Sequence, residues 1–152
     1  MKFGNILELG TDGIGTSQNN RRIVLSNVIY LLVIGLLVFY LITDMIITGA
    51  FRVPETFGSA VPFILIVTGS LCLLLNAIGQ HTAAKVIFTI VWLSSVNLLP
   101  VMIHGTRSGM YYMHPIFCIV SGLTVHLLFS FYTERLLYLF FLVCSFCITF
   151  FS

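Results

Sequence analysis

Charged side chains are scarce in this sequence. Only 8% of its 152 residues are Asp, Glu, Lys or Arg, whereas about 25% are charged in an average soluble domain. So few charges cannot cover the surface of a water-soluble globule, which excludes a monomeric soluble protein and predicts an integral membrane protein. The net charge is only +2 and no basic cluster occurs, so we predict no nucleic acid partner.

Residue sets that carry catalysis are missing as well. The five acidic residues are scattered, and no Ser-His-Asp set or HExxH motif occurs. We therefore predict no catalytic residues and no enzyme activity for this chain. A longer parent protein with a kinase or nucleotide cyclase output remains open.

Cysteine and histidine are few, and their spacing predicts neither a metal nor a cofactor. The four cysteines lie in apolar runs, which argues against a disulfide framework. Cys144 and Cys147 form a CxxC pair that we interpret as two small buried packing residues. Two histidines without a third ligand make a weak zinc signal. Haem would need facing histidines at equal depth, and His104 and His114 lie too near a turn.

Long apolar runs make up most of the remaining sequence. About 20 helical residues cross the roughly 30 Å hydrocarbon core of a bilayer. We predict an all-α polytopic transmembrane helical bundle of about five spans, residues 23–152, after a cytoplasmic amphipathic leader at 1–22. The spans are expected at about 23–48, 60–79, 83–103, 110–132 and 136–152. An odd count leaves the last run outside without a polar flank, so we expect a six-span module cut before its last helix. A complete five-span protein is the alternative.

The distribution of cations predicts the orientation. Cytoplasmic loops carry more Lys and Arg than external ones. A cytoplasmic N-terminus places five cations inside and two outside. The inner set is Lys2, Arg21, Arg22, Lys85 and Arg135, and the outer set is Arg52 and Arg107. Lys85, at the start of the third span, is expected to extend its ammonium group to the interface.

The polar chemistry is concentrated around the turn between the third and fourth runs. We predict a ligand-binding or proton-sensing site there, made of His104, Arg107, Tyr111, Tyr112 and His114. Polar residues at membrane depth are costly and favour a functional interpretation, and histidine ordinarily titrates near physiological pH. The alternatives are interfacial hydrogen bonding to lipid headgroups and, less favoured, a metal site.

A second set of polar residues lies inside the predicted spans. Asn97, Ser121 and His126 are intramembrane polar residues. Together with Asn76 they outline the pathway that a small transporter or channel would use, although so few intramembrane charges argue against a proton-coupled carrier. Small residues, among them Gly35, Gly69 and Gly122, are expected to pack helices closely.

Four segments carry a resemblance to a known family. They are the leader FGNILELG, the Arg21-Arg22 pair before the first run, and the turns SGMYYMHP and FYTERLLY. In layout over the whole chain, the sequence resembles the N-terminal membrane sensor modules of bacterial histidine kinases and class III nucleotide cyclases. The resemblance implies six spans, then a dimeric signalling helix and a cytoplasmic catalytic domain. This chain departs from that pattern by ending after five runs.

The resulting expectation is an integral membrane sensory or receptor module of two-component type signal transduction. It would detect a ligand, lipid or membrane state and relay it to a cytoplasmic output. Its partners would be the lipid bilayer, an unknown small ligand, and a second copy or other membrane subunits. Its location would be the bacterial inner membrane, as a multi-pass protein. The alternatives are a structural or assembly subunit of a membrane complex and, less favoured, a small transporter or channel.

Overall fold

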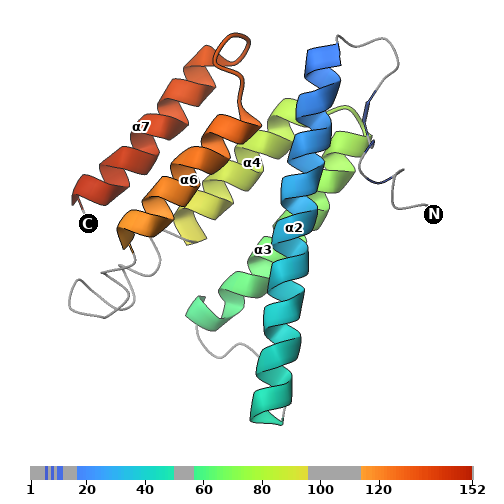
Figure 1. Cartoon of the computed structure of the whole chain (residues 1–152), viewed down its shortest axis with the longest axis vertical. Helices are drawn as coiled ribbons and strands as arrows, with labels where there is room; N and C mark the ends of the chain where they lie inside the picture. Colours follow the sequence, from blue (N-terminus) through green and yellow to red (C-terminus); the bar gives the residue numbers. More distant parts are fainter. Residues whose placement is uncertain are drawn as a thin grey trace. The chain divides into compact units, whose positions relative to one another are not determined.

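The computed structural model describes residues 17–49, 57–95 and 114–151, together with residues 6, 8, 10 and 11. Within these ranges the chain forms five α-helices and no β-strand, which confirms the all-α prediction (Figure 1). The helices are α2 (Ser17–Thr48), α3 (Phe57–Ala77), α4 (His81–Leu93), α6 (His114–Leu128) and α7 (Arg135–Phe151). The predicted boundary between leader and bundle stays a prediction, and residues 17–22 form the first turns of α2.

Two of these helices are long and apolar enough to cross a membrane. They contribute the stretches Asn20–Thr48, of 29 residues, and Ala60–Ala77, of 18 residues. The other helices have 13, 15 and 17 residues in the part of the chain that the structure describes. By length and composition, α2 and α3 therefore favour membrane association, while a bundle of five spans goes beyond what the described helix lengths establish.

The helices belong to two compact units. Unit 1 comprises Met1–Ala84 and unit 2 comprises Lys85–Ser152. In unit 1, α2 packs along α3, and in unit 2, α6 packs along α7 (Figure 1). The boundary falls inside α4, so the first turn of this helix belongs to unit 1 and the remainder to unit 2.

A small residue brings α2 and α3 together. Gly69 of α3 is buried, and a Cβ added to it would lie 3.0 Å from Ile34 Cγ1 of α2. Lipid provides no hydrophobic drive between helices, so close approach at small residues supplies the packing energy. The predicted packing role of Gly69 is thus confirmed. A Cβ added at Gly35 or Gly122 meets nothing within 4 Å among the described residues, so the packing role predicted for those two is not found there.

A tight turn joins α3 to α4. Gly79 has a φ of 82°, a conformation that costs glycine little because it has no Cβ. The amide of Gly79 donates to Asn76 O at 3.1 Å, and the amide of Gln80 donates to Leu75 O at 2.8 Å. This is the Schellman pattern, which satisfies the last carbonyls of a helix. The turn sets Asn76, in the last turn of α3, close to His81, the first residue of α4.

Aromatic packing closes the α6–α7 hairpin of unit 2. The rings of Phe129 and Phe141 stack with centroids 5.3 Å apart. Both side chains are buried, together with Leu128 and Val125 of α6. The connection at residues 129–134 is short, so α6 and α7 run antiparallel as neighbours (Figure 1).

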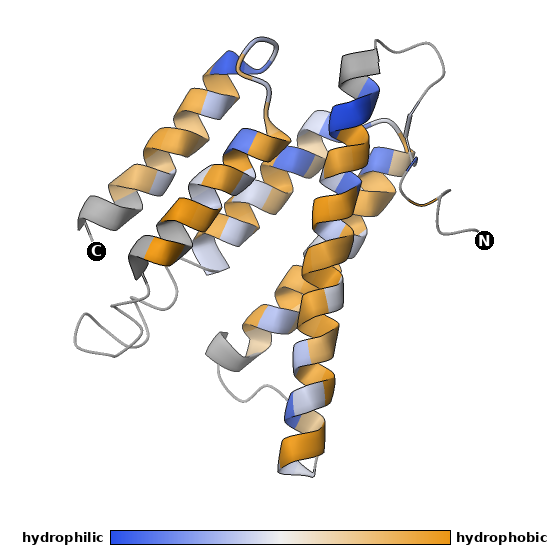
Figure 2. Cartoon of the chain, viewed as in Figure 1, coloured by the Kyte–Doolittle hydropathy of each residue, from blue (hydrophilic) through white to orange (hydrophobic). Residues whose placement is uncertain are grey.

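The outer faces of the helices remain apolar. Phe39, Ile46 and Ile47 of α2 are 69%, 75% and 78% exposed. Hydrophilic residues gather near the N-terminal end of α2 and at the beginning of α7 (Figure 2). Large exposed apolar patches are unusual on soluble monomers. Exposing such a face to the hydrocarbon of a bilayer carries no free-energy cost of hydration.

The packing of Gly69 predicts a sharp contrast between two leucine substitutions. Gly69→Leu forces a large side chain against Ile34 and should destabilise unit 1 by about 1–3 kcal/mol. Gly35→Leu adds the same side chain to the exposed side of α2 and should change stability little. The measurement, made in detergent, is the temperature at which Cys72, which is fully buried, becomes reactive towards a thiol-reactive dye. The other three cysteines are replaced by serine. Equal thermal shifts for both variants would contradict the packing assignment.

Candidate functional site

Most of the site predicted at the turn between the third and fourth apolar runs lies outside the described residues. This applies to His104, Arg107, Tyr111 and Tyr112, and also to the intramembrane residue Asn97. His114 is the first residue of α6, but its side chain is not among those described. The predicted ligand-binding or proton-sensing site therefore stays a prediction.

The structure separates Ser121 and His126, the two residues of the predicted intramembrane polar set whose side chains it describes. Ser121 is fully buried in α6, whereas His126 of the same helix is exposed. His126 Nδ1 lies 3.2 Å from the Tyr138 hydroxyl of α7, with the rings edge to face. The two residues are five positions apart, which places them on different faces of a helix, so they do not form one site.

Asn76 is the centre of a buried hydrogen-bond network in unit 1. Its amide Nδ2 donates to Asn27 Oδ1 at 2.7 Å and to Ser26 Oγ at 3.1 Å, both on α2. Its Oδ1 lies 3.3 Å from His81 Nδ1. Asn27 and Asn76 are fully buried. We call Ser26, Asn27, Asn76 and His81 the amide network.

The donors and acceptors of the amide network have defined partners. Both Asn76 Nδ2 hydrogens are used, and Ser26 Oγ, which accepts one of them, donates its own proton to Ile23 O at 2.8 Å. Because Asn76 Oδ1 can only accept, His81 Nδ1 must carry a proton in this arrangement. A buried amide that lost these partners would cost about 1–3 kcal/mol. The network therefore ties α2, α3 and the start of α4 together in one arrangement.

Gly10 lies directly against this network. A Cβ added to Gly10 would lie 2.6 Å from the ring atom Cε1 of His81 and would also overlap the backbone carbonyl of Asn76. Gly10 has a φ of 80° and lies within a turn in which the amide of Thr11 donates to Glu8 O at 3.0 Å. Only glycine meets both the steric and the backbone requirement here.

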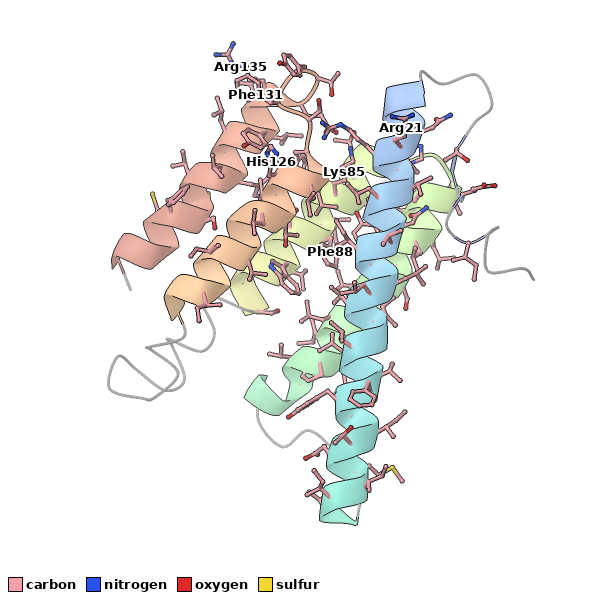
Figure 3. The ribbon with its side chains drawn as sticks, viewed as in Figure 1. Arg21, Lys85, Phe88, His126, Phe131 and Arg135 are labelled. Carbon is pink, nitrogen blue, oxygen red and sulfur yellow. The ribbon has the colours of Figure 1, made fainter. Side chains whose placement is uncertain are left out.

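A buried ion pair dominates the polar chemistry of unit 2. Lys85 Nζ lies 3.1 Å from both Glu134 carboxylate oxygens, and the side chains are 4% and 15% exposed. The amide of Ser130 also donates to Glu134 Oε2, at 3.1 Å. Glu134 sits immediately before α7, whose first backbone bond runs from Tyr138 N to Glu134 O at 2.9 Å. The pair therefore joins α4 to the α6–α7 connection, and Figure 3 labels Lys85 on α4.

Sequence reasoning predicted that Lys85 extends its ammonium group outward to the interface, and this outward direction is wrong, since the side chain is only 4% exposed. A lysine in the first turns of an apolar helix ordinarily extends its ammonium group towards water. Here the group turns inward, because Glu134 supplies a carboxylate 49 positions away in the sequence. The available signal was the presence of a single acidic residue in the short turn FYTER.

Metal and redox chemistry receive no support in the described residues. No group of three His, Cys, Asp or Glu side chains within them could hold a metal ion. The CxxC pair has free thiols. Cys144 is half-buried and Cys147 is exposed, so the prediction that both are buried is wrong for Cys147. The buried side of α7 runs instead through Phe141 and Ser145, four residues apart.

The ion pair predicts strong coupling between two substitutions. Lys85→Met leaves the Glu134 carboxylate buried with only the Ser130 amide, and should cost about 3–5 kcal/mol of unfolding free energy. The double variant Lys85→Met/Glu134→Gln should recover most of that loss, because no charge then remains unpaired. Unfolding is followed by the emission of Trp92, the only tryptophan, whose ring stacks on Phe88 one turn after Lys85.

The matched control is Arg135→Gln. It removes a cation next to Glu134 in the sequence, but this side chain is exposed and makes no ion pair within the described residues. Its stability should stay close to that of the unsubstituted chain. Additive effects of the two single variants would show that Lys85 and Glu134 do not stabilise each other.

The chain was compared with known proteins at three levels. No protein-family model, no curated protein and no solved structure matches it.

Proposed function

We propose that this chain is an integral membrane sensory module with a cytoplasmic N-terminus, in which a bundle of about five spans passes a membrane signal to a cytoplasmic output. The amide network carries the proposal. It is a set of neutral hydrogen-bonding groups within apolar helices, and it is contacted by the N-terminal segment through Gly10. The layout of the sequence, which resembles bacterial sensor modules, supports the same function.

A network of amide hydrogen bonds can rearrange at a smaller free-energy cost than a buried ion pair, so it suits a conformational switch. Breaking a buried ion pair strands a charge, whereas amides and a histidine can exchange partners with one another at smaller cost. A small displacement of α3 against α2 would change the partners of Asn76. Sub-ångström shifts become discrete changes when packed elements have two alternative arrangements.

The position of His81 suggests how a change could be passed on. His81 contacts Asn76 in unit 1, and Lys85, which pairs with Glu134 in unit 2, lies four residues later on the same helix α4. A helix transmits rotation and translation along its axis over such a distance. In this proposal α4 links rearrangement of the amide network to the α6–α7 hairpin.

A structural or assembly subunit is the second candidate. The exposed apolar residues of α2, such as Phe39 and Ile46, would suit contact with other membrane helices as well as with lipid. A subunit of this kind needs no rearrangement. A transporter is less favoured, because Ser121 and His126 lie on different faces of α6. A second copy of the chain or an unknown small ligand remains the proposed partner of the sensor.

The contact of Gly10 supports the proposed topology. Gly10 lies against the end of α3 and the beginning of α4, so this residue is on the same side as the α3–α4 turn. Two crossings, by α2 and α3, return the chain to the side on which it started. With the N-terminus cytoplasmic, this side is the one rich in Lys and Arg.

The topology predicts which residues react from outside the cell. In a cysteine-free background, a cysteine at Gln80, which is exposed, should resist a membrane-impermeant maleimide in intact bacteria and react after permeabilisation. A cysteine at Ser108 should react in intact cells. Labelling of Gln80→Cys but not Ser108→Cys in intact cells would reverse the proposed orientation. Labelling of both positions would contradict the predicted third crossing, which lies between them.

The sensory proposal predicts a conformational response without transport. The chain is reconstituted into liposomes of short-, medium- and long-chain phosphatidylcholine that contain a pH dye. Trp92 emission should shift with bilayer thickness, because the helices adjust to hydrophobic mismatch. The dye should report no more proton flux than in protein-free liposomes. Asn76→Leu, which removes the centre of the amide network, should reduce the Trp92 shift by about half or more.

The control for this experiment is Thr43→Val. Thr43 Oγ1 donates only to Phe39 O in its own helix, at 2.8 Å, so this variant removes a hydroxyl without touching the network and should keep the full response. A Trp92 emission that is flat across all lipids contradicts the sensor and leaves the subunit. Proton flux that Asn76→Leu abolishes would favour the transporter.

A further inference from the structure

Three exposed side chains and the half-buried Tyr138 form an aromatic and cationic cluster where α6 turns into α7. The Arg135 guanidinium carbon lies 5.5 Å from the centroid of the Phe131 ring. The same ring meets Tyr138 edge to face at 5.7 Å and Tyr132 at 5.8 Å. We call Phe131, Tyr132, Arg135 and Tyr138 the turn cluster. Figure 3 shows Arg135 beside Phe131 at this end of the hairpin.

The charge of the turn cluster is that of Arg135 alone. The one acidic residue of the turn, Glu134, points its carboxylate inward to Lys85, and its side chain is only 15% exposed. Glu134 therefore neutralises a buried lysine and not the neighbouring arginine. Arg135 is exposed, and within the described residues its guanidinium makes no ion pair. An exposed single positive charge is thus held on an aromatic platform.

The surroundings of Arg135 are those of a membrane interface. Tyr132 is 87% exposed and Leu136 is 84% exposed, so a phenol and an apolar side chain that are near Arg135 in the sequence are also open to the surroundings. Tyrosine rings with a polar tip gather at the level of the lipid headgroups. The end of the hairpin therefore offers an apolar side chain, a phenolic hydroxyl and a cation within five consecutive residues, 132–136.

The chemistry selects an anionic ligand. A guanidinium presents a planar fork of N–H donors that matches two phosphate oxygens, and stacking on Phe131 restrains it in one orientation. The ring face that could bind a choline ammonium is already covered by Arg135. A zwitterionic choline headgroup therefore gains less here than a phosphodiester with net negative charge.

We propose that the turn cluster is a binding site for the phosphate headgroup of an anionic phospholipid. The proposal rests on the membrane insertion in the proposed function, because a lipid headgroup reaches the turn only if the hairpin end lies at the bilayer surface. The phosphate would accept from Arg135 and from the Tyr132 hydroxyl. The aliphatic part of Leu136 would lie against the glycerol and upper acyl chains.

The test measures which lipid lies next to the cluster. A single tryptophan replaces Phe131 in a Trp92→Phe chain, keeping an aromatic face under Arg135. This chain is placed in nanodiscs of phosphatidylglycerol and phosphatidylcholine in equal amounts, with one of the two lipids brominated. Quenching by brominated phosphatidylglycerol should exceed quenching by brominated phosphatidylcholine by about two- to fivefold, the enrichment that one cation near an anionic surface can bring.

Substitutions and competitors sharpen the result. Arg135→Gln should bring the two lipids to equal quenching, and Arg135→Lys, which lacks the planar fork, should keep only part of the preference. Arg21→Gln removes another exposed arginine, on α2, and should leave the preference unchanged. Free inorganic phosphate should not reduce it, because a lipid is held by its acyl chains as well.

Each remaining outcome has a definite meaning. Strong and equal quenching by both lipids overturns the headgroup site and leaves membrane insertion intact. Quenching by neither lipid overturns the site and also the placement of this hairpin end at the bilayer. A preference that survives Arg135→Gln, or that Arg21→Gln removes, would assign the lipid to another part of the chain.

Discussion

Hydrogen bonding of polar groups away from water is the constraint on which this structure depends. A buried amide within apolar helices has no water to hydrogen-bond with, so its hydrogen-bond partners must come from the chain. Asn76 meets this requirement with two donors to α2 and one acceptor towards His81. The spacing of α2, α3 and the first turn of α4 follows from these three bonds. Gly69 lets the first two helices approach closely enough to make them.

Unit 2 meets the same constraint with charge. Lys85 and Glu134 are each costly to bury alone, and their mutual attraction repays the cost only with good geometry and further hydrogen bonds. The amide of Ser130 supplies one such bond to the carboxylate. Such a pair tolerates little displacement, because separation exposes two charges to a medium that cannot solvate them. It therefore fixes the register of α4 against the turn, whereas the neutral network of unit 1 can rearrange.

The helical class was predictable from composition and run length alone. The chain has too few charged residues for a water-soluble surface, and its apolar runs have the length of membrane-crossing helices. The pairing of polar residues was not predictable. Ser26, Asn27 and Asn76 stand out in their runs as polar exceptions, but nothing local says that positions 49 and 50 apart will meet. Lys85 illustrates the same limit, since its local sequence favours an ammonium group that extends outward, whereas the distant carboxylate of Glu134 turns it inward. The site predicted at His104 to His114 rests on local clustering alone and stays a prediction.

Gly10 connects the fold to the proposed sensory role. Its positive φ and its contact with Asn76 and His81 mean that position 10 has no room for a side chain against the end of α3 and the start of α4. The fit couples two parts of the chain that lie 66 positions or more apart, Gly10 and Asn76. Any movement that separates α3 from α2 must also disturb the surface on which Gly10 rests. A change inside apolar helices would thereby reach the polar N-terminal segment, where a soluble partner could read it, without any polar group having to cross the bilayer.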